Sequence, residues 1–233
     1  MYRYSIILWD VDDTLLNFGA SERAAITRGF EEFGLGECTE AMLADYSKIN
    51  KKYWQMLERK EATKPKILMG RFYEFFEKYG IDKAVTHDFQ PWYQLALGDT
   101  IVFEEGALET LQYLKGKVLQ YAVTNGTKAA QTKKLRKSEL ENLFDDIFIS
   151  EDLGAEKPGE EFFHRAFLRA GIDLSKKSEI LIVGDSLSSD MKGGNGIGID
   201  TCWYNPGKQS PDPGVSVTYE IHKINQVLDI LRG

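Results

Sequence analysis

Cysteine and histidine are scarce in this chain of 233 residues, which has two of the former and three of the latter. Neither Cys38 nor Cys202 belongs to a closely spaced pair, so the sequence predicts no disulfide framework and no cysteine-based zinc site. This cysteine usage is typical of the reducing cytoplasm, which is the location that we expect.

Long hydrophobic runs and an excess of positive charge are also missing. The apolar run that starts at residue 5 (SIILW) is too short for the core of a signal peptide or for a membrane span. The net charge is −7, from 36 acidic and 29 basic residues. This balance argues against binding to nucleic-acid polymers or to anionic membranes, and it leaves the oligomeric state open.

Residues 18–98 have a helical pattern, many aromatic residues and no convincing strand. Capping residues and glycines predict helices over residues 21–33, 39–60 and 65–80, with a fourth over 88–97. Their core is expected to contain aromatic side chains: Tyr53, Trp54, Phe72, Tyr73, Phe75 and Phe76.

The rest of the chain alternates between apolar strands and helices. The predicted strands cover residues 4–9, 118–124, 147–150, 179–184 and 201–204, and the predicted helices 106–114, 127–143, 160–170 and 222–231. This alternation predicts an α/β fold with a Rossmann-like parallel sheet covered on both faces. We expect a core of residues 1–17 and 99–233, with an all-α helical cap, residues 18–98, inserted after the first strand.

Carboxylates follow the first and fourth of these strands. Asp10 and Asp12 lie two residues apart, so their side chains point the same way from extended backbone. Asp185 arrives at the same sheet edge, where ligands gather in open parallel sheets. Oxygen ligands without a nearby histidine or cysteine favour magnesium over zinc.

Donors for an anion follow the other strands. Thr124, Asn125 and Lys157 offer a hydroxyl, an amide and an ammonium group at the same edge. Carboxylates, a divalent cation and anion donors together are what phosphoryl transfer needs, because charge neutralisation carries most of its catalysis.

Four ordered motifs resemble those of the haloacid dehalogenase-like (HAD-like) hydrolases. They are Asp10-Val11-Asp12-Asp13-Thr14, Thr124-Asn125-Gly126, Lys157-Pro158, and Gly184-Asp185 through Asp190. The resemblance covers nearly the whole chain and includes the helical cap.

This resemblance implies a magnesium-dependent phosphatase acting on a small phosphorylated metabolite. Asp10 is then the nucleophile that forms an aspartyl-phosphate, and Asp12 is the general acid and base. The implied magnesium ligands are the Asp10 carboxylate, the Asp12 main-chain carbonyl and Asp185. Thr124, Asn125 and Lys157 would hold the phosphoryl group, and Asp190 would orient Lys157 or a metal-bound water.

Several alternatives stay open at this level. Haloacid dehalogenases lack the second aspartate, so Asp12 argues for phosphate ester hydrolysis. A phospho-regulated scaffold would have lost catalytic residues, and none is missing. Asp13 and the stretch GDSLSSDMKGG resemble the pyrimidine 5′-nucleotidases that clear non-standard nucleotides, which favours nucleoside monophosphates over sugar phosphates and phosphoglycolate.

Substrate choice is expected to depend on the helical cap, because the core sees mainly the phosphoryl group. The candidates there for an anion contact or for base stacking are Lys64, Lys66, Arg71, Tyr53 and Trp54. The basic run Lys133–Lys137 is predicted to be a solvated helix face.

Overall fold

The core of the protein is a six-stranded parallel sheet, seen here in a computed structural model that describes residues 2–232. The strand order is β3-β2-β1-β4-β5-β6, and every neighbouring pair is parallel. The strands are β1 (Ile6–Trp9), β2 (Leu119–Thr124), β3 (Asp146–Ile149), β4 (Ile180–Gly184), β5 (Asp200–Tyr204) and β6 (Tyr219–Ile221). The predicted Rossmann-like α/β class is therefore confirmed.

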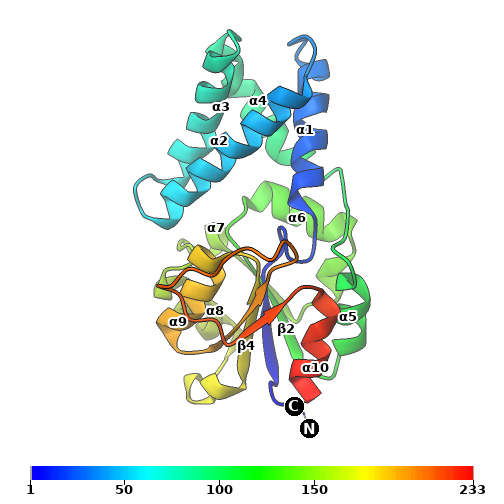
Figure 1. The fold of residues 1–233 in the computed structure, drawn as a ribbon, viewed down its shortest axis with the longest axis vertical. Helices are drawn as coiled ribbons and strands as arrows, with labels where there is room; N and C mark the ends of the chain where they lie inside the picture. Colours follow the sequence, from blue (N-terminus) through cyan, green and yellow to red (C-terminus); the bar gives the residue numbers. More distant parts are fainter. Residues whose placement is uncertain (1, 233) are drawn as a thin grey trace.

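Helices cover both faces of this sheet (Figure 1). They are α5 (Ala107–Leu114), α6 (Lys128–Lys137), α7 (Ser150–Leu153), α8 (Glu160–Ala170), α9 (Lys192–Ile197) and α10 (Val227–Arg232). Along β1, Ile7 and Trp9 pack with α5 and α10, while Ile6 and Leu8 pack with α8 on the opposite face. Burial of both faces explains why the strands read as continuous apolar runs.

The helical cap stands over the carboxyl ends of the strands (Figure 1). It contains α1 (Phe18–Glu32), α2 (Glu40–Glu58), α3 (Lys64–Lys78) and α4 (Thr86–Ala96). These helices share a hydrophobic cluster of their own, in which Phe72, Phe75 and Phe76 are fully buried as expected. Tyr53 packs at its margin, and Trp54 instead borders the cavity described below. The exact division at residues 17/18 and 98/99 stays a prediction.

Some predicted boundaries differ from the structure for local reasons. Asn17, and not Ser21, caps α1 by accepting a hydrogen bond from the Ala20 N–H at 2.8 Å. The helix predicted over 127–143 ends at Lys137, because the backbone turns left-handed at Glu139 with φ of 60°. The short strand β6 was not predicted, since three residues give too little alternation to detect.

The turn after β1 is the local feature that joins core and cap. Asp13 has a φ of 59°, a left-handed conformation that aspartate tolerates better than most residues. Its carboxylate accepts the main-chain N–H of Phe18, the first residue of α1, at 2.9 Å. Asp13 thus has a structural task at the entrance to the helical cap.

Within residues 2–232, no helix combines the length and the apolar character that crossing a bilayer requires.

Candidate active site

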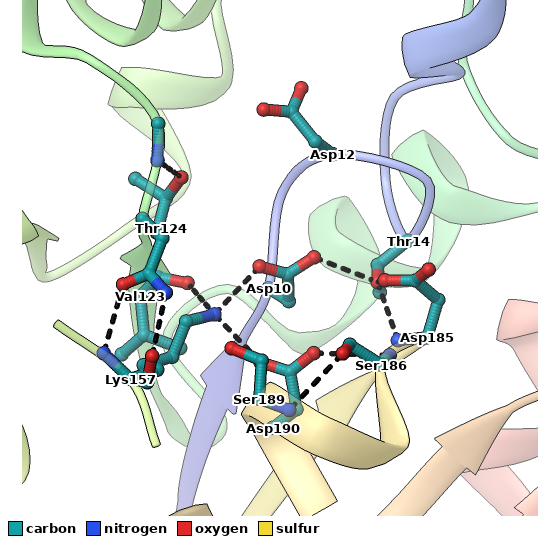
Figure 2. Close-up of polar contacts among 12 residues, drawn as sticks. Asp10, Asp12, Thr14, Val123, Thr124, Lys157, Asp185, Ser186, Ser189 and Asp190 are labelled. Atoms are coloured by element: carbon teal, nitrogen blue, oxygen red, sulfur yellow. Dashed lines mark hydrogen bonds and ion pairs between the residues drawn. The ribbon is translucent and has the colours of Figure 1, made fainter. Parts of the chain in front are cut away.

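Three strands deliver the predicted site residues to one edge of the sheet (Figure 2). Asp10 directly follows β1, Thr124 ends β2, and Asp185 directly follows β4. Because β1 lies between β2 and β4 in parallel register, these three positions meet at the same carboxyl edge. The sheet topology therefore brings together the residues that the sequence motifs singled out.

Lys157 is the buried cation at the centre of the site. Its side chain is 1% exposed, and its Nζ lies 2.7 Å from Asp10 Oδ1 and 2.6 Å from Asp190 Oδ1. It also donates to the main-chain carbonyl of Val123 at 2.8 Å. Burial disfavours the ammonium charge, but the two carboxylates outweigh burial and raise the pKa of Lys157 above its usual value. The lysine is therefore held charged.

Thr14 connects the first and fourth motifs. Its hydroxyl donates to Asp10 Oδ2 at 3.1 Å and accepts the main-chain N–H of Asp185 at 3.1 Å. The sequence analysis assigned no catalytic or binding role to Thr14, although Thr14 is the last residue of the first motif. Its hydroxyl fixes the rotation of the Asp10 carboxylate.

Three carboxylates form a cluster that fits a divalent cation. Oxygen atoms of Asp10, Asp185 and Asp190 all lie within 4.8 Å of one another. Burial raises the pKa of Asp10 to about 7 against the lowering effect of Lys157, and burial followed by the neighbouring carboxylates raises that of Asp185 well above its usual range. Hard oxygen donors that repel one another in a buried place suit magnesium.

Asp12 does not join this cluster through its side chain. Its carboxylate points away from Asp10 (Figure 2) and pairs with the Nζ of Lys134, and it also accepts a hydrogen bond from Gln131 Nε2 at 2.6 Å. The Lys134 side chain is 1% exposed, so the prediction of a solvated basic face is wrong for this residue. Lys134 lies about one helical turn beyond Gln131 on α6, so both side chains reach Asp12. Its position within the basic run Lys133–Lys137 did not distinguish it from its solvated neighbours.

Thr124 and Asn125 shape the loop after β2. Thr124 is 2% exposed, and its hydroxyl accepts the main-chain N–H of Gly126 at 3.0 Å. The Asn125 amide pairs with the backbone of Lys157, accepting from its N–H at 2.9 Å and donating to its carbonyl at 2.8 Å. Asn125 therefore positions the Lys157 loop, and its contact with phosphate stays a prediction.

A cavity of about 330 Å³ joins this site to the helical cap. Of the five cap residues that the sequence suggested, Arg71 and Trp54 border it. Lys64 is buried elsewhere, where it donates to Ser150 Oγ at 2.5 Å, and Lys66 is exposed. The cavity volume is at the lower end of the range of about 300–1,000 Å³ found for small-molecule sites.

The position of the acidic site, between a Rossmann-like sheet and a helical cap, places the protein in the class of capped α/β hydrolases. The chain belongs to the haloacid dehalogenase-like hydrolases, whose family model matches residues 7–204.

Individual relatives match nearly end to end. The HAD-hydrolase YfnB of Bacillus subtilis is 37% identical over 99% of this chain and 97% of its own. The pyrimidine 5′-nucleotidase PynA of Streptococcus pneumoniae is 34% identical over 98% of this chain and 95% of its own. The glyceraldehyde 3-phosphate phosphatase of Methanopyrus kandleri is 29% identical over 97% of this chain and 96% of its own.

A crystal structure of YfnB bound to magnesium has the same fold, with a TM-score of 0.91 and 36% identity. The match covers 99% of this chain and 100% of that one.

Proposed function

We propose that this protein is a magnesium-dependent phosphomonoesterase that acts on nucleoside 5′-monophosphates through an aspartyl-phosphate. The observation that carries the proposal is Lys157, which is shared by Asp10 and Asp190 beside Asp185. A buried ammonium next to a carboxylate nucleophile is placed to neutralise phosphoryl oxygens as they approach.

In the first half of the proposed reaction, a carboxylate oxygen of Asp10 attacks phosphorus. The bond between phosphorus and the ester oxygen breaks, and protonated Asp12 gives its proton to the leaving alcohol. Thr14 holds the rotamer of Asp10 through its 3.1 Å hydrogen bond. Thr124 and the nearby main-chain N–H groups are proposed to bind the phosphoryl oxygens.

In the second half, Asp12 accepts a proton from the attacking water, and the bond between Asp10 and phosphorus breaks to release inorganic phosphate. Magnesium, when bound, would supply positive charge that offsets the negative charge of the carboxylates and of the phosphoryl oxygens. Asp10 and Asp185 are its proposed side-chain ligands, with the Asp12 main-chain carbonyl as a third, and Asp190 is proposed to orient Lys157. Asp190 is held by Lys157 and by the Ser186 N–H, which leaves it less free to bind the cation.

The nucleotide part of the proposal is supported by the pyrimidine 5′-nucleotidase relative. A sugar-phosphate phosphatase is the second candidate, and the glyceraldehyde 3-phosphate phosphatase relative supports it. Dehalogenation is disfavoured by Asp12, because displacement of halide from carbon requires no proton donor.

Hydrolysis of p-nitrophenyl phosphate tests the chemistry. We expect turnover that requires added magnesium, disappears with EDTA, and falls at least about 1,000-fold in Asp10→Asn, which removes the nucleophile. Asp13→Asn is the matched control, because it removes a neighbouring charge and keeps the oxygen that accepts the Phe18 N–H. Equal rates for Asp10→Asn and the wild type would refute the mechanism.

A further inference from the structure

The helix α2 turns one continuous face toward the cavity. The residues of this face that border the cavity recur at intervals of three and one along the helix: Ser47, Asn50, Lys51, Trp54, Gln55 and Glu58. Such spacing places side chains on one side of an α-helix. Figure 1 shows α2 sloping down toward the core, with its C-terminal end the lower one. Glu58, the last residue of α2, therefore stands at the core end of this face.

The carboxylate of Glu58 reaches the loop that carries the fourth motif. Its Oε2 accepts a hydrogen bond from Ser188 Oγ at 2.6 Å, and Ser188 lies between Asp185 and Asp190 in the chain. Burial raises the pKa of Glu58, and the Ser188 hydrogen bond and the charge of Lys157 act against this rise. Burial, and to a smaller extent the charge of Glu58, also raises the pKa of Asp190. Glu58 is thus close enough to the proposed catalytic groups for its charge to act on them.

The end of α2 is an unfavourable place for a carboxylate. A helix C-terminus carries partial negative charge, and the last turn of α2 has no basic residue to offset Glu58. The next residue, Arg59, pairs with Glu61, and within residues 2–232 Glu58 forms no ion pair. A charge that costs stability at its own position and has no ionic partner indicates a functional task.

The direction of phosphoryl transfer places the leaving alcohol on the same side of the cavity. In the proposed reaction Asp10 attacks phosphorus from the edge of the sheet, and the attacking and leaving oxygens lie roughly in line through phosphorus. The ester oxygen therefore points away from Asp10 and toward the helical cap. Because α2 forms a wall of the cavity there, the alcohol part of the substrate lies along the face that ends at Glu58.

The buried bases that border the cavity are already offset by acids. Lys134 and Lys157 pair directly with aspartates. Arg71 is linked to Glu22 through Asn50, by hydrogen bonds of 2.6 and 2.7 Å. None of these three bases is left to neutralise the carboxylate at the end of α2.

The remaining base on the cavity wall is Lys51, which lies on the same face of α2 and is exposed. It precedes Glu58 by about two helical turns, or about 10 Å along the axis. Solvent and salt screen most of its effect at that separation. A leaving group beside Glu58 therefore meets repulsion if it carries negative charge, and it meets a hydrogen-bond acceptor if it carries hydroxyl or ammonium groups.

We propose that Glu58 selects substrates by the charge of their leaving group. It admits phosphomonoesters of uncharged or cationic alcohols, and it rejects alcohols that carry a carboxylate or a second phosphate near the ester. The inference rests on the proposed phosphatase function. It applies to nucleosides and to sugars alike, because it does not depend on a base.

Three esters of two-carbon alcohols isolate this charge. Phosphoglycolate, 2-hydroxyethyl phosphate and 2-aminoethyl phosphate are similar in size, and at about pH 8 their leaving groups carry one negative charge, no charge and one positive charge. We expect Glu58→Gln to raise kcat/KM for phosphoglycolate relative to 2-hydroxyethyl phosphate by about 10-fold. It should lower kcat/KM for 2-aminoethyl phosphate on the same scale by about 3- to 10-fold, as expected of one nearby unit charge in a partly hydrated site.

Two control variants separate the charge from the contact. Ser188→Ala removes the hydrogen bond and keeps the charge of Glu58, so both ratios should stay within about 3-fold of the wild type. Glu61→Gln removes a charge from an exposed side chain outside the cavity and should also leave the ratios in that range. Unchanged ratios in Glu58→Gln would overturn the proposal, as would equal changes in Ser188→Ala and Glu58→Gln.

Charge reversal provides a second variant. Glu58→Lys should prefer phosphoglycolate to 2-aminoethyl phosphate, the opposite of the wild-type order. A cation suits a helix C-terminus, so the urea midpoints of Glu58→Lys and Glu58→Gln should equal or exceed that of the wild type. Lower midpoints in both variants, with equal losses of rate for all three esters, would show that Glu58 only holds the cap to the core and would overturn the proposal.

Calorimetric binding to Asp10→Asn protein keeps the two proposals distinguishable. The affinity should fall from 2-aminoethyl phosphate through 2-hydroxyethyl phosphate to phosphoglycolate, and adding Glu58→Gln should reduce the differences. This result in a protein whose wild-type form hydrolyses no phosphomonoester would support the selection by charge and refute the phosphatase. Hydrolysis of all three esters at equal kcat/KM would refute the selection by charge alone.

Discussion

Lys157→Met is the substitution that most directly tests the electrostatics of the site. Lys157 Nζ contacts Asp10 and Asp190 at 2.7 and 2.6 Å, with both carboxylates nearly buried. At an effective dielectric constant of roughly 20, each contact is worth about 6 kcal/mol of attraction. Desolvation of the three charges offsets much of this gain, and breaking a buried pair typically costs about 3–5 kcal/mol. We therefore expect a loss of unfolding free energy in that range.

The assay is urea unfolding in the presence of EDTA, with the midpoint and the m-value both recorded. Lys128→Met is the control, because the Lys128–Asp152 pair spans a similar 2.6 Å but its lysine is 61% exposed. Such a surface pair contributes less than about 1 kcal/mol. A similar small loss in both variants would contradict the argument.

A double variant identifies the source of the loss. Lys157→Met leaves the carboxylates of Asp10 and Asp190 without their lysine partner. In the double variant Lys157→Met with Asp190→Asn, the second of these carboxylates is replaced by a neutral amide. The double variant should be less destabilised than the sum of the single variants, by about 1–3 kcal/mol. Strict additivity would show that Lys157 stabilises the protein through packing and not through charge.

Two further substitutions test the surroundings of the site. Lys134→Met should lower kcat/KM for p-nitrophenyl phosphate by about 10- to 100-fold, because Asp12 loses the charged one of the two groups that position it; a rate within twofold of the wild type would refute a positioning role. Asp13→Val should reduce the unfolding free energy by about 1–3 kcal/mol, because a β-branched residue is strained at a φ of 59°, whereas Asp13→Gly should cost less. Urea unfolding that ranks the two in the opposite order would show that strain is not the cause.

The fold could be predicted from the sequence where a local pattern of hydrophobic residues determines the structure. Strands buried on both faces read as apolar runs, so β1, β2 and β4 were predicted to within two residues. The turn at Glu139 has no glycine to mark it, and its left-handed φ of 60° ended a helix that composition alone would have continued. The strand β6 depends on pairing with β5, a tertiary contact that no local pattern encodes.

The site shows the same division between local and tertiary information. Asp10 and Asp185 follow strands and Thr124 ends one, and parallel topology requires the three residues to meet at one edge of the sheet. Lys134 was mistaken for a solvated residue because its basic neighbours conceal it, and only the docking of α6 against the turn after β1 buries it beside Asp12. Arg71 and Trp54 were two of five equal candidates, and only the structure distinguishes them from the other three, by placing both at the cavity wall.

The net charge of the carboxylate cluster links the acidic stretch after β1 to the proposed chemistry. Asp10, Asp185 and Asp190 carry three negative charges when ionised, and Lys157 neutralises one of them. Burial raises the pKa of all three carboxyl groups, and the lowering effect of Lys157 does not fully offset it. Two negative charges remain for a divalent cation to balance, and a phosphoryl dianion could not approach them otherwise. We therefore expect magnesium to bind before the substrate, or together with it.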